Sequence, residues 1–266
     1  MATKPPSSPS HGSVFQRPAR GRADRVVVVG AHLDSTPDGP GMNDNGSGSA
    51  AILEIARQIG RLDIKPYNKL RFAWWGAEES GLVGSQYYID NLGIEDLANI
   101  AMNLTFDMLG SPNYVRFVYD GDGSDTELPG PSGSGLIESV FLDYFDDQGL
   151  PTEPTAFDGG TDYAPFIEVG IPAGGLFTGA TEIKTEEQAA IYGGTAGEAY
   201  DACYHEACDD FDNASLEALD QTSDAAAHAV LTAAQSRESV NARVARTLAD
   251  QSWGDMMEFR GSLLVK

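Results

Sequence analysis

Lysine and histidine are scarce in this sequence, and it contains no long apolar run. Its 266 residues include 17 basic residues, only five of them lysine, against 40 acidic ones, so the net charge is −23. So little positive charge argues against a nucleic-acid partner, because such a partner requires many neutralised phosphates. It also argues against an anionic membrane surface. No stretch approaches 18 consecutive apolar residues, so we expect no transmembrane helix.

Cysteine is also rare. Cys203 and Cys208 are the only two cysteines, and they are five residues apart. We favour a disulfide between them, which indicates an oxidising compartment. Residues 1–24 are rich in proline, serine and arginine and lack the apolar stretch of a signal peptide, so we predict a disordered tail there. Because of the expected disulfide, we predict a secreted protein, whose signal peptide is not part of this sequence.

Apolar runs alternate with amphipathic segments along most of the chain. Buried strands are predicted at 25–34, 70–77, 101–108, 115–120 and 171–179. Helices are predicted at 47–60, 82–92, 135–147 and 216–235, and residues 238–266 are expected to form a helical or irregular extension. This alternation predicts an α/β fold with a mostly parallel central sheet and helices on both faces, in one domain of residues 25–237.

Histidine and acidic residues follow the predicted strands. Catalytic groups in open α/β sheets gather beyond the carboxyl ends of the strands. Two histidines among carboxylates are ligands typical of zinc, whereas carboxylates alone would indicate calcium or magnesium. A lone histidine, or an aspartate in a glycine-rich loop, is commonly structural. The residues concerned are His32, Asp34, Asp44, Glu78, Glu79, Asp107 and His205.

The adjacent pair Glu78–Glu79 is the hardest of these to explain structurally. The pair directly follows the apolar run FAWWGA. Two neighbouring carboxylates at a buried strand end repel each other and are costly to desolvate unless positive charge lies beside them. The pattern therefore predicts a metal site.

Several segments resemble a known family. They are GAHLDS (30–35), GMNDNGSGSAAILE (41–54), RFAWWGAEESGLVGSQYY (71–88), NLTFDMLGSPN (103–113), GGLFTGA (174–180) and CYHEACD (203–209). Together they resemble the secreted, Streptomyces-type leucine aminopeptidases, which are two-zinc exopeptidases of an α/β fold. The resemblance extends over about residues 25–234. It implies a monomer that removes large apolar residues from the N-termini of peptides and proteins.

The resemblance also implies a role for each candidate residue. His32 and Asp107 would hold one zinc ion, Glu79 and His205 the other, and Asp44 would bridge the two. Asp34 would orient the imidazole of His32. Glu78 would be the general base, and Tyr204 would steady the oxyanion. Met108 and Phe177 would line a pocket for the first side chain.

The sequence departs from the family in three places. Only about 30 residues precede His32, fewer than in the family, so N-terminal edge elements are expected to be missing and the sheet to have an unpaired edge. Gly160 replaces an arginine of the family that would contact the substrate. Asp220 and Asp224 match a helical pair of a calcium site in relatives, but the N-terminal partners of that pair are absent. The run DGDGSDTE (120–127) is interpreted as a turn, because Asp125 stands where an EF-hand needs glycine.

Two other functions fit parts of the pattern. One is a single-zinc enzyme such as a glutaminyl cyclase, which Asp44 disfavours because it stands where a bridging ligand belongs. The other is a fragment that binds metal or peptide without turnover. Counting the zinc ions per chain separates the first alternative from the aminopeptidase, and cooperative unfolding that zinc stabilises would contradict the second.

Overall fold

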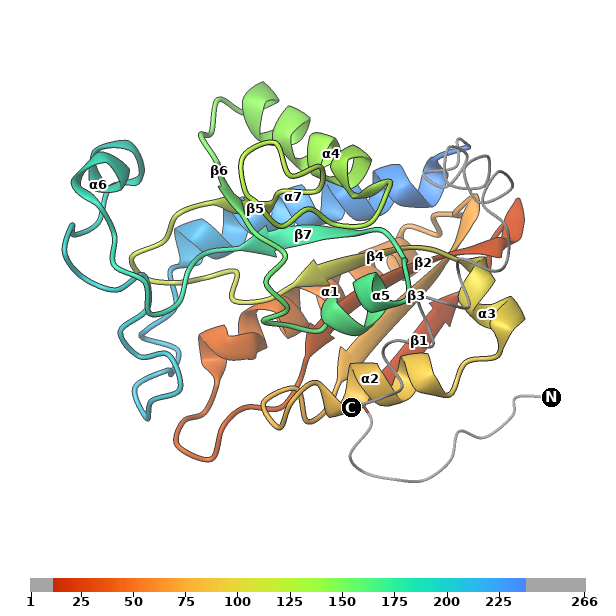
Figure 1. Ribbon diagram of the computed structural model, residues 1–266, viewed down its shortest axis with the longest axis horizontal. Helices are drawn as coiled ribbons and strands as arrows, with labels where there is room; N and C mark the ends of the chain where they lie inside the picture. Colours follow the sequence, from red (N-terminus) through yellow and green to blue (C-terminus); the bar gives the residue numbers. More distant parts are fainter. Residues whose placement is uncertain (1–11, 238–266) are drawn as a thin grey trace.

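A computed structural model describes residues 12–237, and a single seven-stranded sheet forms its centre (Figure 1). In space the strands follow the order β1-β3-β2-β4-β7-β5-β6. Their bounds are β1 (Ser13–Arg17), β2 (Arg22–His32), β3 (Asn68–Trp75), β4 (Ile100–Phe106), β5 (Phe117–Tyr119), β6 (Glu153–Thr155) and β7 (Ala173–Phe177). The four central strands, β3, β2, β4 and β7, run parallel, whereas β1 and β5 are antiparallel to their partners β3 and β7.

Strand β2 lies between β3 and β4, and the chain reverses its direction across the sheet at this point. From β2 the chain passes to β3 on one side, and β4 then lies on the other side. Ligand sites of open α/β sheets form where the strand order reverses in this way, beyond the carboxyl ends of the strands. The topology therefore brings the residues after β2, β3 and β4 together.

Helices cover both faces of the sheet, as predicted. Their bounds are α1 (Gly48–Arg61), α2 (Val83–Asp90), α3 (Ile94–Asn99), α4 (Ser134–Asp147), α5 (Ala164–Glu168), α6 (Glu186–Tyr192) and α7 (Leu216–Gln235), with a short irregular turn η1 (Met42–Ser47) before α1. Helices α1, α4 and α7 pack on one face in a core that includes Val27 and Val29. Helices α2 and α5 pack on the other face with Val26 and Val28. Because alternate valines face opposite helical layers, the segment 26–29 of β2 is apolar at every position.

Residues 13–24 correct the prediction of a disordered tail. Strand β1 pairs with β3 in antiparallel register from Ser13↔Trp74 to Arg17↔Leu70, and β2 already begins at Arg22. Strand β1 therefore covers β3 and is itself the edge strand on this side of the sheet. Most side chains of β1 are exposed, so the position of this strand depends on backbone hydrogen bonds to β3. For the same reason its sequence shows little apolar pattern.

The predicted extension at 238–266 and the first 11 residues of the predicted tail lie outside the described residues. Within residues 12–237, none of the helices is both long and apolar enough to cross a membrane.

Candidate metal centre

Three strand ends and two loops supply the predicted ligands. His32 is the last residue of β2, and Asp107 directly follows β4. Glu79 follows β3 after Ala77, which has a positive φ of 59° and turns the chain there. Asp44 lies in η1, shortly before α1. Helix α1 begins at Gly48 in close contact with the end of β4, since a Cβ on Gly48 would lie 2.2 Å from the Phe106 carbonyl oxygen.

The side chains converge as a bridging arrangement requires. The Asp44 carboxylate lies between two histidines, with Oδ1 3.0 Å from His32 Nε2 and Oδ2 3.0 Å from His205 Nε2. Asp107 Oδ1 lies 3.4 Å from the same nitrogen of His32, and Glu79 Oε2 lies 3.0 Å from that of His205. The structure therefore pairs His32 with Asp107 and His205 with Glu79 on opposite sides of Asp44.

Several of these buried atoms lack hydrogen-bond partners. They are Asp107 Oδ1, Glu79 Oε1 and His205 Nε2. Unsatisfied buried polar atoms are rare in folded proteins, and those at one point require an explanation. One ligand atom each from His32, Asp44 and Glu79 also lies within 4.8 Å of the others. Imidazole nitrogens and carboxylate oxygens at this spacing fit a divalent cation, and zinc accepts both ligand types.

The pKa shifts of the clustered side chains also indicate a site for a cation. Burial, followed by the charge of Asp107, raises the pKa of Glu78 to about 9. Burial, followed by the charge of Asp44, raises the pKa of Glu79 to about 8. Burial lowers the pKa of His32, but the carboxylates of Asp107 and Asp44 outweigh burial and raise this pKa well above its usual value. A bound cation would reverse the shifts of the carboxylates.

These shifts predict how the stability of the metal-free protein depends on pH. The ordinary pKa of glutamate is 4.5, so above about pH 5 the folded chain holds protons that the unfolded chain has released, on Glu79 up to about pH 8 and on Glu78 up to about pH 9. This stabilisation is complete below pH 4.5, decreases progressively as the pH rises from there, and is fully lost once the pH has passed about 8 for Glu79 and about 9 for Glu78. We expect the Tm in excess chelator to fall from pH 5 to pH 8.

Zinc should change this dependence. Protons compete with metal for the ligands, so the rise in Tm on adding zinc should be larger at pH 8 than at pH 6. Calorimetric scans with chelator and with zinc at each pH measure both quantities. A metal-free Tm that rises from pH 5 to pH 8 would contradict the prediction.

Residues behind the ligands hold them in place. The main-chain oxygen of Asp34 lies 3.0 Å from His32 Nδ1, whereas its carboxylate oxygen lies 3.8 Å away. The Asp34 carboxylate instead accepts hydrogen bonds from the backbone N–H groups of Glu78 (3.0 Å) and Glu79 (3.3 Å). Asp34 therefore contacts the imidazole through its backbone, and its side chain positions the glutamate pair, which sequence reasoning did not predict.

Thr161 is a further residue that the sequence analysis missed. Its hydroxyl donates a hydrogen bond of 2.6 Å to Asp107 Oδ2, and both residues are buried. Metal-binding carboxylates commonly have such a partner. Thr161 directly follows Gly160, where the sequence departs from the family. That departure was the signal in the sequence that could have drawn attention to Thr161. Gly160 itself is exposed.

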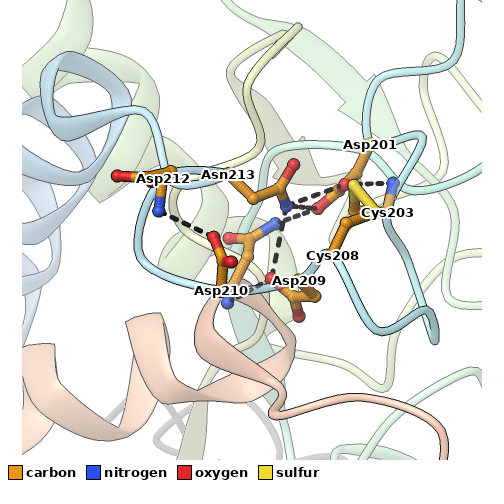
Figure 2. The surroundings of a disulfide bond; sticks show 8 residues. Asp201, Cys203, Cys208, Asp209, Asp210, Asp212 and Asn213 are labelled. Atoms are coloured by element: carbon orange, nitrogen blue, oxygen red, sulfur yellow. Dashed lines mark hydrogen bonds between the residues drawn. A yellow bond between two sulfur atoms is a disulfide. The ribbon is translucent and has the colours of Figure 1, made fainter.

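Cys203 and Cys208 form a disulfide (Figure 2). The loop that it closes contains Tyr204 and His205. The Tyr204 ring stacks on the imidazole of His205, with 3.7 Å between the ring centroids. Burial and the neighbouring carboxylates raise the pKa of Tyr204, so its hydroxyl keeps its proton. His205 has a positive φ of 60°, a conformation that non-glycine residues adopt mainly where the surrounding structure enforces it.

The two predicted pocket residues lie at neighbouring strand ends. Met108 is buried and follows Asp107, and its carbonyl oxygen accepts a hydrogen bond from Thr178 N. Phe177 ends β7 and stacks on Phe117, with 6.0 Å between the centroids. Met108 therefore pairs through its backbone with Thr178, the residue after Phe177.

The remaining predicted sites do not form ligand clusters of the same kind. Asp220 and Asp224 are exposed on α7 and belong to neither group of close ligand atoms among residues 12–237. The second of these groups consists of Asp120, Asp122 and Glu138. The Asp120 carboxylate there accepts hydrogen bonds from three backbone N–H groups of residues 123–126, which gives the turn predicted at 120–127.

The fold and the candidate ligands define a metallopeptidase-like α/β domain with a cluster of histidines and carboxylates at the switch point of its sheet. The chain belongs to peptidase family M28, whose model matches residues 14–230. It is 55% identical over 215 residues to an aminopeptidase of Pseudomonas aeruginosa, and this match covers 81% of the chain and 40% of the relative. It is 49% identical over 216 residues to leucine aminopeptidase 2 of Trichophyton equinum, covering 81% of the chain and 43% of the relative.

A solved structure shares the fold. The zinc aminopeptidase BSAP from Bacillus subtilis superimposes with a TM-score of 0.67 at 27% identity, over 85% of this chain and 51% of the other. The chain thus spans less than half the length of the two sequence relatives and about half of the structural one.

Proposed function

We propose that this chain is a two-zinc aminopeptidase that hydrolyses the first peptide bond of peptides and proteins. The observation that carries the proposal is Asp44, whose two carboxylate oxygens each lie 3.0 Å from the Nε2 of a different histidine. With one oxygen toward each histidine, Asp44 can bind two cations at once, which a single-zinc site does not require. The names of the M28 relatives support the same class of reaction.

His32 and Asp107 would hold one zinc ion, Glu79 and His205 the other, and Asp44 both. Such a pair supplies Lewis-acid polarisation of the scissile carbonyl and activation of a water molecule. Glu78 would then remove a proton from the attacking water and deliver it to the leaving amine. The protonated hydroxyl of Tyr204 would donate a hydrogen bond to the developing oxyanion.

The free α-amine and the first side chain of the substrate would set the specificity. Carboxylates at the site, in a protein of charge −23, attract a protonated amine, which favours an exopeptidase. Met108, two residues after β4, and Phe177, the last residue of β7, would form an apolar pocket that prefers leucine-like residues. In the family, an arginine at the position of Gly160 would contact the substrate beyond the cleaved bond. Glycine cannot make this contact, so short peptides would bind less tightly.

The disulfide supports secretion as the location. A bond between Cys203 and Cys208 persists in oxidising compartments and is rare in the cytosol of mesophiles. Secretion and action as a monomer remain part of this proposal.

Hydrolysis of leucine p-nitroanilide tests the activity. The protein is stripped with chelator, reloaded with zinc, and compared on this substrate and on its N-acetylated form. Zinc-dependent release from the free amine only, with two zinc ions per chain, supports the proposal. A folded protein that carries two zinc ions and hydrolyses neither substrate contradicts it, and one zinc per chain with cyclisation of glutaminyl peptides assigns the single-zinc class instead.

A further inference from the structure

Two buried carboxylates stand directly behind the metal ligands and take no part in the proposed reaction. Asp201 and Asp209 are each 1% exposed, and they flank the disulfide loop that carries His205 (Figure 2). Isolated buried carboxylates are costly, so each must be compensated by its neighbours. Their contacts show what they hold together.

Asp209 binds the backbone that presents the bridging ligand. Its Oδ1 accepts a hydrogen bond from Asn43 N at 2.9 Å, and its Oδ2 accepts one from Asp44 N at 3.1 Å. Its carbonyl oxygen also accepts a hydrogen bond from Met42 N at 3.0 Å. Three successive N–H groups around Asp44 are therefore fixed by one residue, located four positions after His205.

Asp201 and two asparagines complete the connection. Asn43 Nδ2 donates to Asp201 Oδ2 at 2.7 Å, and Cys203 N donates to Asp201 Oδ1 at 2.9 Å. Asn213 lies between the two carboxylates, and its Nδ2 donates to both (Figure 2). Asn43 Oδ1 accepts from Gly110 N, just after the strand end that carries Asp107. The cluster thus joins the loops of Asp44, His205 and Asp107.

The donors in this cluster are all N–H groups of the backbone or of amides. Both oxygens of each carboxylate accept such bonds, so the cluster is satisfied without a cation. The cluster therefore has a structural effect: it fixes the position of Asp44 relative to the disulfide loop, in which His205 has a positive φ.

We infer that Asp209 is a positioning residue for the metal pair, because its carboxylate holds Asp44 at the distance from His205 at which both can bind one cation. This inference rests on the proposed two-zinc function of the site. The Asp209→Asn substitution preserves shape but turns an N–H₂ group toward the N–H of Asn43 or Asp44, two donors facing each other. Substitutions of residues behind metal ligands typically reduce metal affinity by about 10–100-fold.

The experiment measures zinc binding and thermal unfolding of wild type, Asp209→Asn and Asp212→Asn, each metal-free and at buffered zinc concentrations. Asp212 is an exposed aspartate of the same loop, so its variant controls for the loss of one charge. We expect Asp209→Asn to bind zinc at least about tenfold more weakly. We also expect a smaller zinc-induced rise in Tm for it, and kcat to fall more than KM rises, with Asp212→Asn like wild type.

A merely structural role gives a different result. It would lower the Tm of metal-free and zinc-loaded Asp209→Asn by the same amount and leave its zinc affinity unchanged, which would overturn the inference. Asn213→Ala provides a milder second test, because it removes the donor shared by both carboxylates and keeps the backbone bonds of Asp209. It should lose part of the zinc-induced rise in Tm, and an unchanged rise would also overturn the inference. Two tightly bound zinc ions in an inactive wild type would contradict the proposed reaction but not this role.

Discussion

Glu78→Gln should lower kcat/KM on leucine p-nitroanilide by about 10²–10⁴-fold, the contribution usual for a positioned general base. Glu78 is half-buried at the end of β3, and its backbone N–H is fixed by the Asp34 carboxylate at 3.0 Å. Glutamine keeps that bond and the shape of the side chain but cannot accept the proton of the attacking water. Because Glu78 is not among the atoms that converge on Asp44, the variant should still bind two zinc ions.

Two matched variants make this result specific. Glu79→Gln removes the neighbouring carboxylate, whose Oε2 lies 3.0 Å from His205 Nε2, and should lose zinc together with activity. Glu95→Gln, on the exposed side of α3, should behave as wild type. Zinc content from mass spectrometry, measured beside the kinetics, separates the two glutamates. A Glu78→Gln enzyme that retains most of its kcat would contradict the assignment of the base.

Asp44→Asn should have the largest effect on metal binding. Asparagine has one oxygen, so one of the two histidines would face an N–H₂ group, and a single residue could no longer bind both cations. The loss of affinity should exceed the about 10–100-fold that substitutions behind metal ligands cause. Zinc content should fall from two ions to one or fewer per chain.

Thermal unfolding in zinc checks this prediction independently of activity. A ligand at 100 times its Kd stabilises the folded state by about 2.7 kcal/mol, and only about 0.4 kcal/mol of this remains when affinity falls 100-fold at the same zinc concentration. Asp38→Asn, an exposed aspartate in the loop after β2, is the control and should keep the full rise in Tm. Two tightly bound zinc ions in Asp44→Asn would exclude a bridging role for Asp44.

The layered α/β fold could be predicted because its physical cause is local. The valines of β2 and the regular apolar spacing of α1, α4 and α7 each report burial of their own segment. Helix α7 is an example, because it extends over Leu216–Gln235 as predicted and is capped by Ser215 directly before it. Strand β1 was missed for the opposite reason, because its side chains are mostly exposed and its backbone finds partners only on β3.

The sequence by itself determined the ligand types and their place after successive strands, because parallel strands end at the same edge of a sheet. Only the tertiary structure decided what supports those ligands. Asp34 uses its carboxylate on the N–H groups of Glu78 and Glu79, and Asp209 holds the N–H group of Asp44 from 165 residues away. Hydrogen bonds between such distant segments leave no periodicity or spacing in the sequence, since each partner is defined only when the chain has folded.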